Sequence, residues 1–207
     1  MTCIAYFLVF VALIQHTLAH FELTFPPSKG VAKDTGFIPP CGGYDIASEK
    51  RTLLPLETPF VEINSDHELY NYSVNVIVGN SPSAADYFET SPNFVSAANG
   101  TRNYSLASCL QFNLSQNISN GTNATIQVTY NSTAGKFYQC VDVTFLYSMN
   151  DFNKSICTNA NGTHPLIPSD NDTSTMSSTD MSDAPGQFQL ASGFVLCVAV
   201  LISFFLI

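Results

Sequence analysis

Short runs that alternate apolar and polar residues are the feature of this sequence that most restricts its fold. The runs HFELTF (20–25), NYSVNVIVG (71–79), TIQVTYN (125–131) and QCVDVTFLYS (139–148) are rich in β-branched and aromatic residues. Successive side chains of a strand point to opposite faces of a sheet, so this period of two predicts half-buried strands. One short helix is expected in SAADYF (83–88). The sequence therefore predicts an all-β fold, an antiparallel β-sandwich of the immunoglobulin or fibronectin-like type.

The first residues of the chain are typical of a secretory signal. Residues 4–14 are almost wholly apolar, and Thr17 and Ala19 put small side chains at the two positions that a signal peptidase reads. Cleavage after Ala19 would remove residues 1–19 and make His20 the mature N-terminus. His16 would take that place only after cleavage behind Gln15, which is a poor residue there. We therefore expect a secreted protein that begins at His20.

The last residues are typical of a glycosylphosphatidylinositol (GPI) anchor signal. The apolar run at 194–207 is shorter than the about 20 residues that a spanning helix needs, and it has no basic flank. Ser182, Asp183 and Ala184 suit the attachment site, with lipidation at Ser182 and removal of 183–207. The alternative is a merely hydrophobic or tail-anchoring C-terminus. We expect the protein on the extracellular face of the plasma membrane or in the cell wall.

Composition divides the rest of the chain into one domain and a stalk. Residues 158–182 are rich in Ser, Thr, Asn and Asp, which predicts a flexible, O-glycosylated stalk after a folded domain over 20–157. Asp and Glu number 16 against 7 Lys and Arg, for a net charge of −9. Nucleic acids and anionic membranes need clustered positive charge, so this balance argues against them as partners and favours cations.

Disulfides and N-linked sugars are both expected in a secreted domain of this kind. Of the 6 cysteines, one falls in the leader and one in the C-terminal tail, and the others predict two disulfides. Three pairings are possible. We favour Cys41 with Cys157 and Cys109 with Cys140, because they would close the sandwich end to end. Asn-x-Ser/Thr sequons predict glycans at Asn71, Asn99, Asn103, Asn113, Asn117, Asn120, Asn123, Asn131, Asn153, Asn161 and Asn171.

An N-terminal histidine offers a metal ion two nitrogens at once. An α-amine and an imidazole have reference pKa values of about 7.7–8.0 and 6.5, so both lose their protons to a metal near neutrality. A second imidazole would complete a three-nitrogen site, a histidine brace, which suits Cu(II). His67 directly precedes a predicted strand, whereas His164 lies in the predicted stalk, where a fixed distance to His20 would be hard to hold. The alternative for His67 is a plain surface-loop histidine.

A known family shares a set of motifs with this chain. The motifs are His20-Phe21 opening a strand, Pro26, Gly30, PCGGYD at 40–45, His67, and QCVDVTF at 139–145. Together they resemble the fungal copper acquisition factors, GPI-anchored proteins related in fold to lytic polysaccharide monooxygenases (LPMOs). The resemblance implies a copper ion held by His20, His67 and Asp142, and a role in copper handling at the cell surface rather than in sugar cleavage.

The role of Asp142 as a copper ligand is implied by that resemblance, and the alternation of side chains along its strand indicates which face it occupies. Alternation along 140–145 sends Asp142 to the face opposite Val141 and Val143. The carboxylate then either faces solvent or reaches the copper, where it would favour Cu(II) over Cu(I) and fill space that O₂ needs. Asp66, beside His67, is the alternative ligand or a supporting partner.

We expect an extracellular, GPI-anchored, non-catalytic protein that captures Cu(II) and passes it to an uptake system. A plasma-membrane copper transporter or a cell-wall polysaccharide is the expected macromolecular partner. The first alternative is a copper-dependent polysaccharide monooxygenase, and the second is a metal-free cell-wall glycoprotein. The sequence contains no GxSxG, HExxH or phosphate-binding loop. Six aromatic residues could form a platform that binds carbohydrate: Tyr70, Tyr72, Tyr87, Phe88, Tyr138 and Tyr147. Their spacing along strands instead predicts that most of them belong to the core or to cross-strand pairs.

Overall fold

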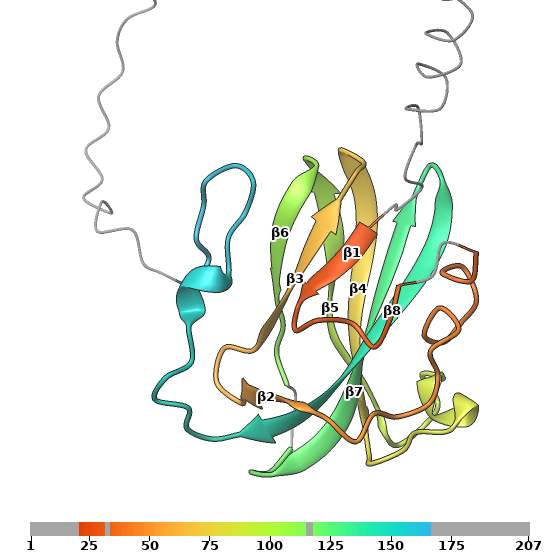
Figure 1. Ribbon diagram of the computed structural model, residues 1–207, viewed down its shortest axis with the longest axis vertical. Coiled ribbons are helices and arrows are strands. Elements are labelled where there is room, and N and C mark those ends of the chain that lie inside the picture. The colour runs from red at the N-terminus through yellow and green to blue at the C-terminus, as the bar shows by residue number, and fades with distance from the viewer. Residues whose placement is uncertain (1–20, 32–33, 115–117, 167–207) are drawn as a thin grey trace, which may run out of the picture. The chain divides into compact units, whose positions relative to one another are not determined.

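The predicted all-β sandwich is confirmed. A computed structural model describes residues 21–31, 34–114 and 118–166, and two β-sheets form the fold (Figure 1). The elements are β1 (Phe21–Phe25), β2 (Thr52–Pro55), β3 (Phe60–Ser65), β4 (Leu69–Val78), the 3₁₀ helix η1 (Ala84–Tyr87), β5 (Phe94–Asn103), β6 (Leu106–Gln111), β7 (Thr122–Ser132), β8 (Gly135–Leu146) and the 3₁₀ helix η2 (Lys154–Ile156).

One sheet has three strands in the order β1-β3-β6, and the other has five in the order β2-β8-β7-β4-β5. Every pairing is antiparallel except that of β2 with β8, which is parallel. The four runs singled out in the sequence form β1, β4, β7 and β8. The short helix expected at 83–88 is the 3₁₀ helix η1.

The core lies between the two sheets and follows from alternation along the central strands. In β8, Val141, Val143 and Phe145 are almost fully buried and pack in this core. Asp142 and Cys140 point to the outer face of the same strand, as the sequence predicted, yet they are buried too. The chain between β1 and β2 crosses that outer face, where the backbone N–H of Lys29 donates to the carbonyl of Cys140 at 2.8 Å.

The structure corrects the disulfide pairing. All four cysteines form disulfides, as expected, but Cys41 pairs with Cys140 and Cys109 with Cys157. The predicted pairing was wrong because Cys140 faces outward from β8, beneath the segment that carries Cys41, while Cys109 belongs to β6 in the other sheet. Each disulfide therefore fastens a connecting segment to one sheet, and neither joins the two ends of the sandwich.

Two glycines that follow Cys41 explain the PCGG motif. Gly42 and Gly43 have φ angles of 65° and 87°, in the left-handed region that favours glycine. A Cβ atom on Gly42 would lie 2.5 Å from the backbone oxygen of Tyr138. The motif thus brings the Cys41 segment close to β8, and its role is structural.

The described chain continues beyond Cys157 and lies against β6. The amide of Ala160 donates to the carbonyl of Ala107 at 2.8 Å, and the Asn159 side chain accepts from the amide of Cys109 at 2.9 Å. Part of the segment expected to be a stalk is therefore attached to the domain. Among the residues that the structure describes, no helix is long and apolar enough to cross a membrane.

Candidate metal centre

His67 lies in the turn between β3 and β4, and a serine holds its backbone there. The Ser65 hydroxyl accepts from the His67 amide at 3.1 Å and donates to the His67 carbonyl at 2.9 Å. It also shares a hydrogen bond of 2.7 Å with the Tyr130 hydroxyl of β7. A serine that bonds to the backbone two residues on is a common turn device. The turn carrying His67 is thereby linked to both sheets.

An aromatic ring fixes the surroundings of the His67 side chain. The imidazole is half-buried, and its centroid lies 6.5 Å from that of the Tyr130 ring. Tyr130 is fully buried and also packs on Tyr70 at 4.7 Å. Burial raises the pKa of the Tyr130 hydroxyl, and the nearby Asp66 charge adds to that effect. Tyr130 is therefore a neutral, apolar support for the imidazole at neutral pH.

The start of β1 reaches the same ring. Phe21 stacks on Tyr130 with 4.7 Å between centroids and 10° between planes. In the β1–β3 register, Phe21 lies opposite Ser65. The Gln139 amide clamps this end of β1, since it donates to the Phe21 carbonyl and accepts from the Leu23 amide, both at 2.9 Å. Phe21 and His67 thus both pack against the Tyr130 ring.

His20 lies outside the described residues, so its place in a brace stays a prediction. Its neighbour Phe21 is packed on Tyr130, the ring beside His67. The leader 1–19, most of the stalk, Ser182 and the segment 183–207 also lie outside the described part of the chain.

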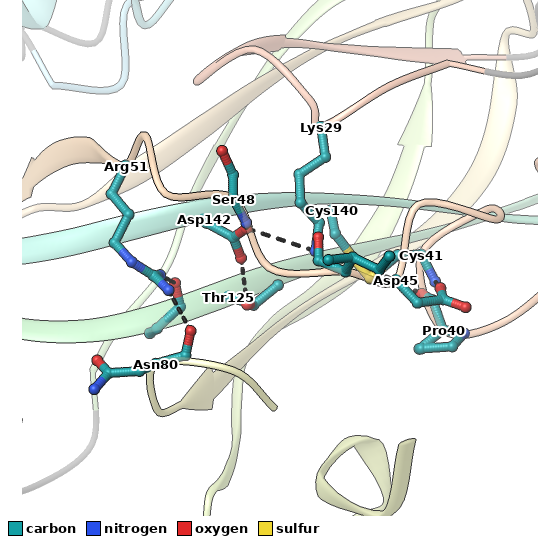
Figure 2. Close-up of polar contacts among 12 residues, drawn as sticks. Lys29, Pro40, Cys41, Asp45, Ser48, Arg51, Asn80, Thr125, Cys140 and Asp142 are labelled. Carbon is teal, nitrogen blue, oxygen red and sulfur yellow. Dashed lines mark hydrogen bonds and ion pairs between the residues drawn. A yellow bond between two sulfur atoms is a disulfide. The ribbon is translucent and has the colours of Figure 1, made fainter. Parts of the chain in front are cut away.

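Asp142 occupies a different place, a buried polar cluster on the outer face of β8 (Figure 2). Its carboxylate accepts from the Ser48 amide at 2.6 Å and from the Thr125 hydroxyl at 2.5 Å. The Lys29 ammonium lies 3.6 Å away, with only 7% of its side chain exposed. Burial lowers the pKa of Lys29, and the Asp142 charge opposes that shift.

The structure does not bring Asp142 to His67. Asp142 pairs with Thr125, and Tyr130 lies farther along β7 from Thr125, by about 17 Å at about 3.4 Å per residue. An odd residue separation also puts the Thr125 and Tyr130 side chains on opposite faces of the sheet. Asp66, which is exposed, is the carboxylate next to His67. In the described ranges, no group of three or more His, Cys, Asp or Glu side chains could hold a metal ion.

The aromatic residues considered for a carbohydrate platform are dispersed. Tyr70 is 1% exposed and belongs to the core, whereas Tyr147 is 64% exposed. Tyr87, Phe88 and Tyr138 line a groove on the outer face of the five-stranded sheet. Sequence reasoning missed the polar partners of Asp142 and the Tyr130 support of His67, since both depend on contacts between distant segments.

Comparisons with known proteins agree with the motifs. The chain is 29% identical over 157 residues to copper acquisition factor BIM1 of Cryptococcus neoformans var. grubii, covering 72% of this chain and 70% of that protein. It is 32% identical over 164 residues to an uncharacterised protein of Aspergillus fumigatus, covering 76% of this chain and 65% of that protein.

Among solved structures, it is similar to an LPMO catalytic domain from Listeria monocytogenes (TM-score 0.46, 15% identity, 61% of this chain and 99% of that chain). It is also similar to an LPMO from Kitasatospora papulosa (TM-score 0.41, 14% identity, 63% of this chain and 74% of that chain). A model of the family "Copper acquisition factor BIM1-like" matches residues 18–162. The chain therefore belongs to the family of BIM1-like copper acquisition factors.

Proposed function

We propose that the mature protein captures Cu(II) outside the cell with three nitrogens: the α-amine and imidazole of His20 and the imidazole of His67. Removal of the leader after Ala19 creates the amine ligand. A GPI anchor at Ser182 then keeps the protein at the cell surface, where it supplies copper for uptake. The observation that carries this proposal is the shared ring: Phe21, which directly follows His20, and His67 both pack on Tyr130.

The donors beside this ring suit a cupric ion. Imidazole and amine nitrogens favour Cu(II), which stands at the top of the divalent series. The Ser65 turn and the Tyr130 ring restrict His67, which lowers the entropy lost when a ligand is ordered. The Asp66 carboxylate adds a negative charge next to a dication, and we assign it the supporting role that was the alternative for Asp66, in place of the ligand role that the family resemblance implied for Asp142. Because such a charge stabilises the cupric state, we infer capture and release rather than catalysis.

The test is a copper titration followed by electron paramagnetic resonance on protein processed by its own host, with its first residue determined. His67→Ala should weaken Cu(II) binding by more than about 100-fold, beyond the about 10–100-fold usual for residues that only position a ligand. It should also remove nitrogen couplings from the spectrum. Asp66→Asn should weaken binding by about tenfold.

His164→Ala is the matched control, because His164 is exposed and lies in the segment after η2. It should leave binding and spectrum unchanged. Unaltered copper binding by the His67 variant, or a mature chain that begins at another residue, would refute the brace. Release of oxidised oligosaccharides from chitin or glucan with a reductant present would instead support a monooxygenase.

A further inference from the structure

A groove of about 620 Å³ crosses the outer face of the five-stranded sheet, on the side turned away from the core. Its floor is made by side chains of β4, β5 and β7, and its walls by η1 with the residues after it, by the Pro39-Pro40 segment and by β8. The volume lies within the range of about 300–1,000 Å³ usual for small-molecule sites. The groove has no part in the copper site proposed above.

The lining combines ring faces with fixed amide groups. Phe88 is 66% exposed, and Tyr87 and Tyr138 line the groove with it. On the floor, the Asn75 amide donates to Gln127 at 3.0 Å, and Gln127 donates to the Pro40 carbonyl at 2.9 Å. A sugar ring presents C–H faces that pack on aromatic rings and hydroxyls that bond to amides. Carbohydrate is therefore the ligand class that this lining suits.

A glycosylation sequon opens directly into the groove. Asn99 begins the sequon Asn99-Gly100-Thr101, is exposed, and lines the groove. In the β4–β5 register Asn99 lies opposite Ser73, another lining residue. Directly opposed Cβ atoms are about 4.5–5.5 Å apart, so the Asn99 side chain stands on the groove floor beside Ser73. The first sugar of a glycan at Asn99 would begin on that floor.

We propose that this groove is the seat of the N-linked glycan carried by Asn99. A tethered sugar has an effective concentration on the order of millimolar, so contacts too weak to hold a free oligosaccharide suffice. The sequons at Asn71 and Asn131 lie opposite each other on β4 and β7. Both are on the same outer face, where their glycans would hinder a large external polymer. The occupant is therefore the protein's own glycan and not a cell-wall polysaccharide.

The test uses the full chain made in a fungal secretory host. Glycopeptide mass spectrometry first establishes that Asn99 carries a glycan. Cleavage by an endoglycosidase is then timed separately at Asn99 and at Asn161, an exposed sequon in the segment after η2. Native protein is compared with reduced, denatured protein, in which no groove exists.

We expect cleavage at Asn99 to be at least about tenfold slower in the native protein, which corresponds to about 1.4 kcal/mol of protection. Cleavage at Asn161 should be similar in both states. Phe88→Ala should restore most of the rate at Asn99 in the native protein. Tyr147→Ala should not, although Tyr147 is an aromatic side chain of nearly the same exposure, 64% against 66%. An unmodified Asn99, native cleavage as fast as denatured, or equal effects of the two substitutions would overturn the proposal.

Discussion

Asp142→Asn should destabilise the domain and leave copper binding unchanged. The substitution keeps the shape of the side chain and removes its charge. The remaining oxygen can still accept from the Ser48 amide, and the Thr125 hydroxyl can turn to accept from the new amide group. Neither change helps Lys29, whose ammonium lies 3.6 Å from the carboxylate with a side chain only 7% exposed. The substitution therefore removes the carboxylate that contacts a nearly buried cation, and the more distant Asp45 charge remains.

The expected loss follows from that geometry. Removing one partner of a buried ion pair typically costs about 3–5 kcal/mol. We expect about 3 kcal/mol, the lower end, because the two hydrogen bonds at the carboxylate can be remade. For a domain of this size that loss lowers Tm by about 10 °C. The double variant Asp142→Asn, Lys29→Met should recover most of it, since it removes the uncompensated ammonium and keeps both hydrogen bonds at residue 142.

Urea unfolding of metal-free protein measures the stability, and a copper titration of the same folded samples measures the affinity. Metal must be removed for the first measurement, because a ligand bound only to the native state adds stability of its own. If Asp142→Asn instead weakened copper binding at least tenfold in protein that was still folded, Asp142 would be a ligand. The separation from His67 derived above would then be mistaken.

Three further outcomes are expected. Replacing Cys109 and Cys157 by Ser frees a loop with a sequence separation of 48 residues, which on the chain-entropy model lowers the unfolding free energy by about 4 kcal/mol in urea titrations. Burial raises the pKa of Tyr70 from 10.0 to about 12, so the folded state keeps a proton that the unfolded chain loses. Tyr70 should therefore contribute a fall in stability of about 3 kcal/mol between these pH values, and chemical unfolding of Tyr70→Phe should show a total fall that is smaller by that amount. A Met left ahead of His20 removes the α-amine ligand and should abolish tight copper binding in calorimetry, whereas native processing should restore it.

Local pattern was enough to predict part of the fold. The alternation in β1, β4, β7 and β8 is strong, and it also assigned Val141 and Asp142 to opposite faces of β8 correctly. The strands that it missed have weaker patterns. β5 contains Asn, Gly and Arg within FVSAANGTRN, and β2 is four residues long and ends in Pro55. Such segments form strands because neighbouring strands pair with them, and local sequence does not contain that information.

The partners of the functional residues were beyond the reach of local pattern. His67 was identified from its position before a strand, but its support by Tyr130 depends on the turn after β3 lying against β7. Alternation correctly placed Asp142 on the outer face of β8, but it did not indicate which residues cover that face. The answer, Lys29 and Ser48, comes from the connection between β1 and β2, whose described residues form no regular strand or helix. The disulfide pairing was unpredictable for the same reason.

The segment that follows Cys157 has a consequence for self-association. β6 is an edge strand of its sheet. The unpaired backbone groups of an edge strand can pair with a strand of another molecule, which is a common route to aggregation. The Ala160 amide and the Asn159 side chain occupy two of those groups, on Ala107 and Cys109. The disulfide at Cys157 keeps this cover in place. The segment after Cys157 thus covers part of the outer edge of β6 and should hinder pairing of that strand with a second copy of the chain.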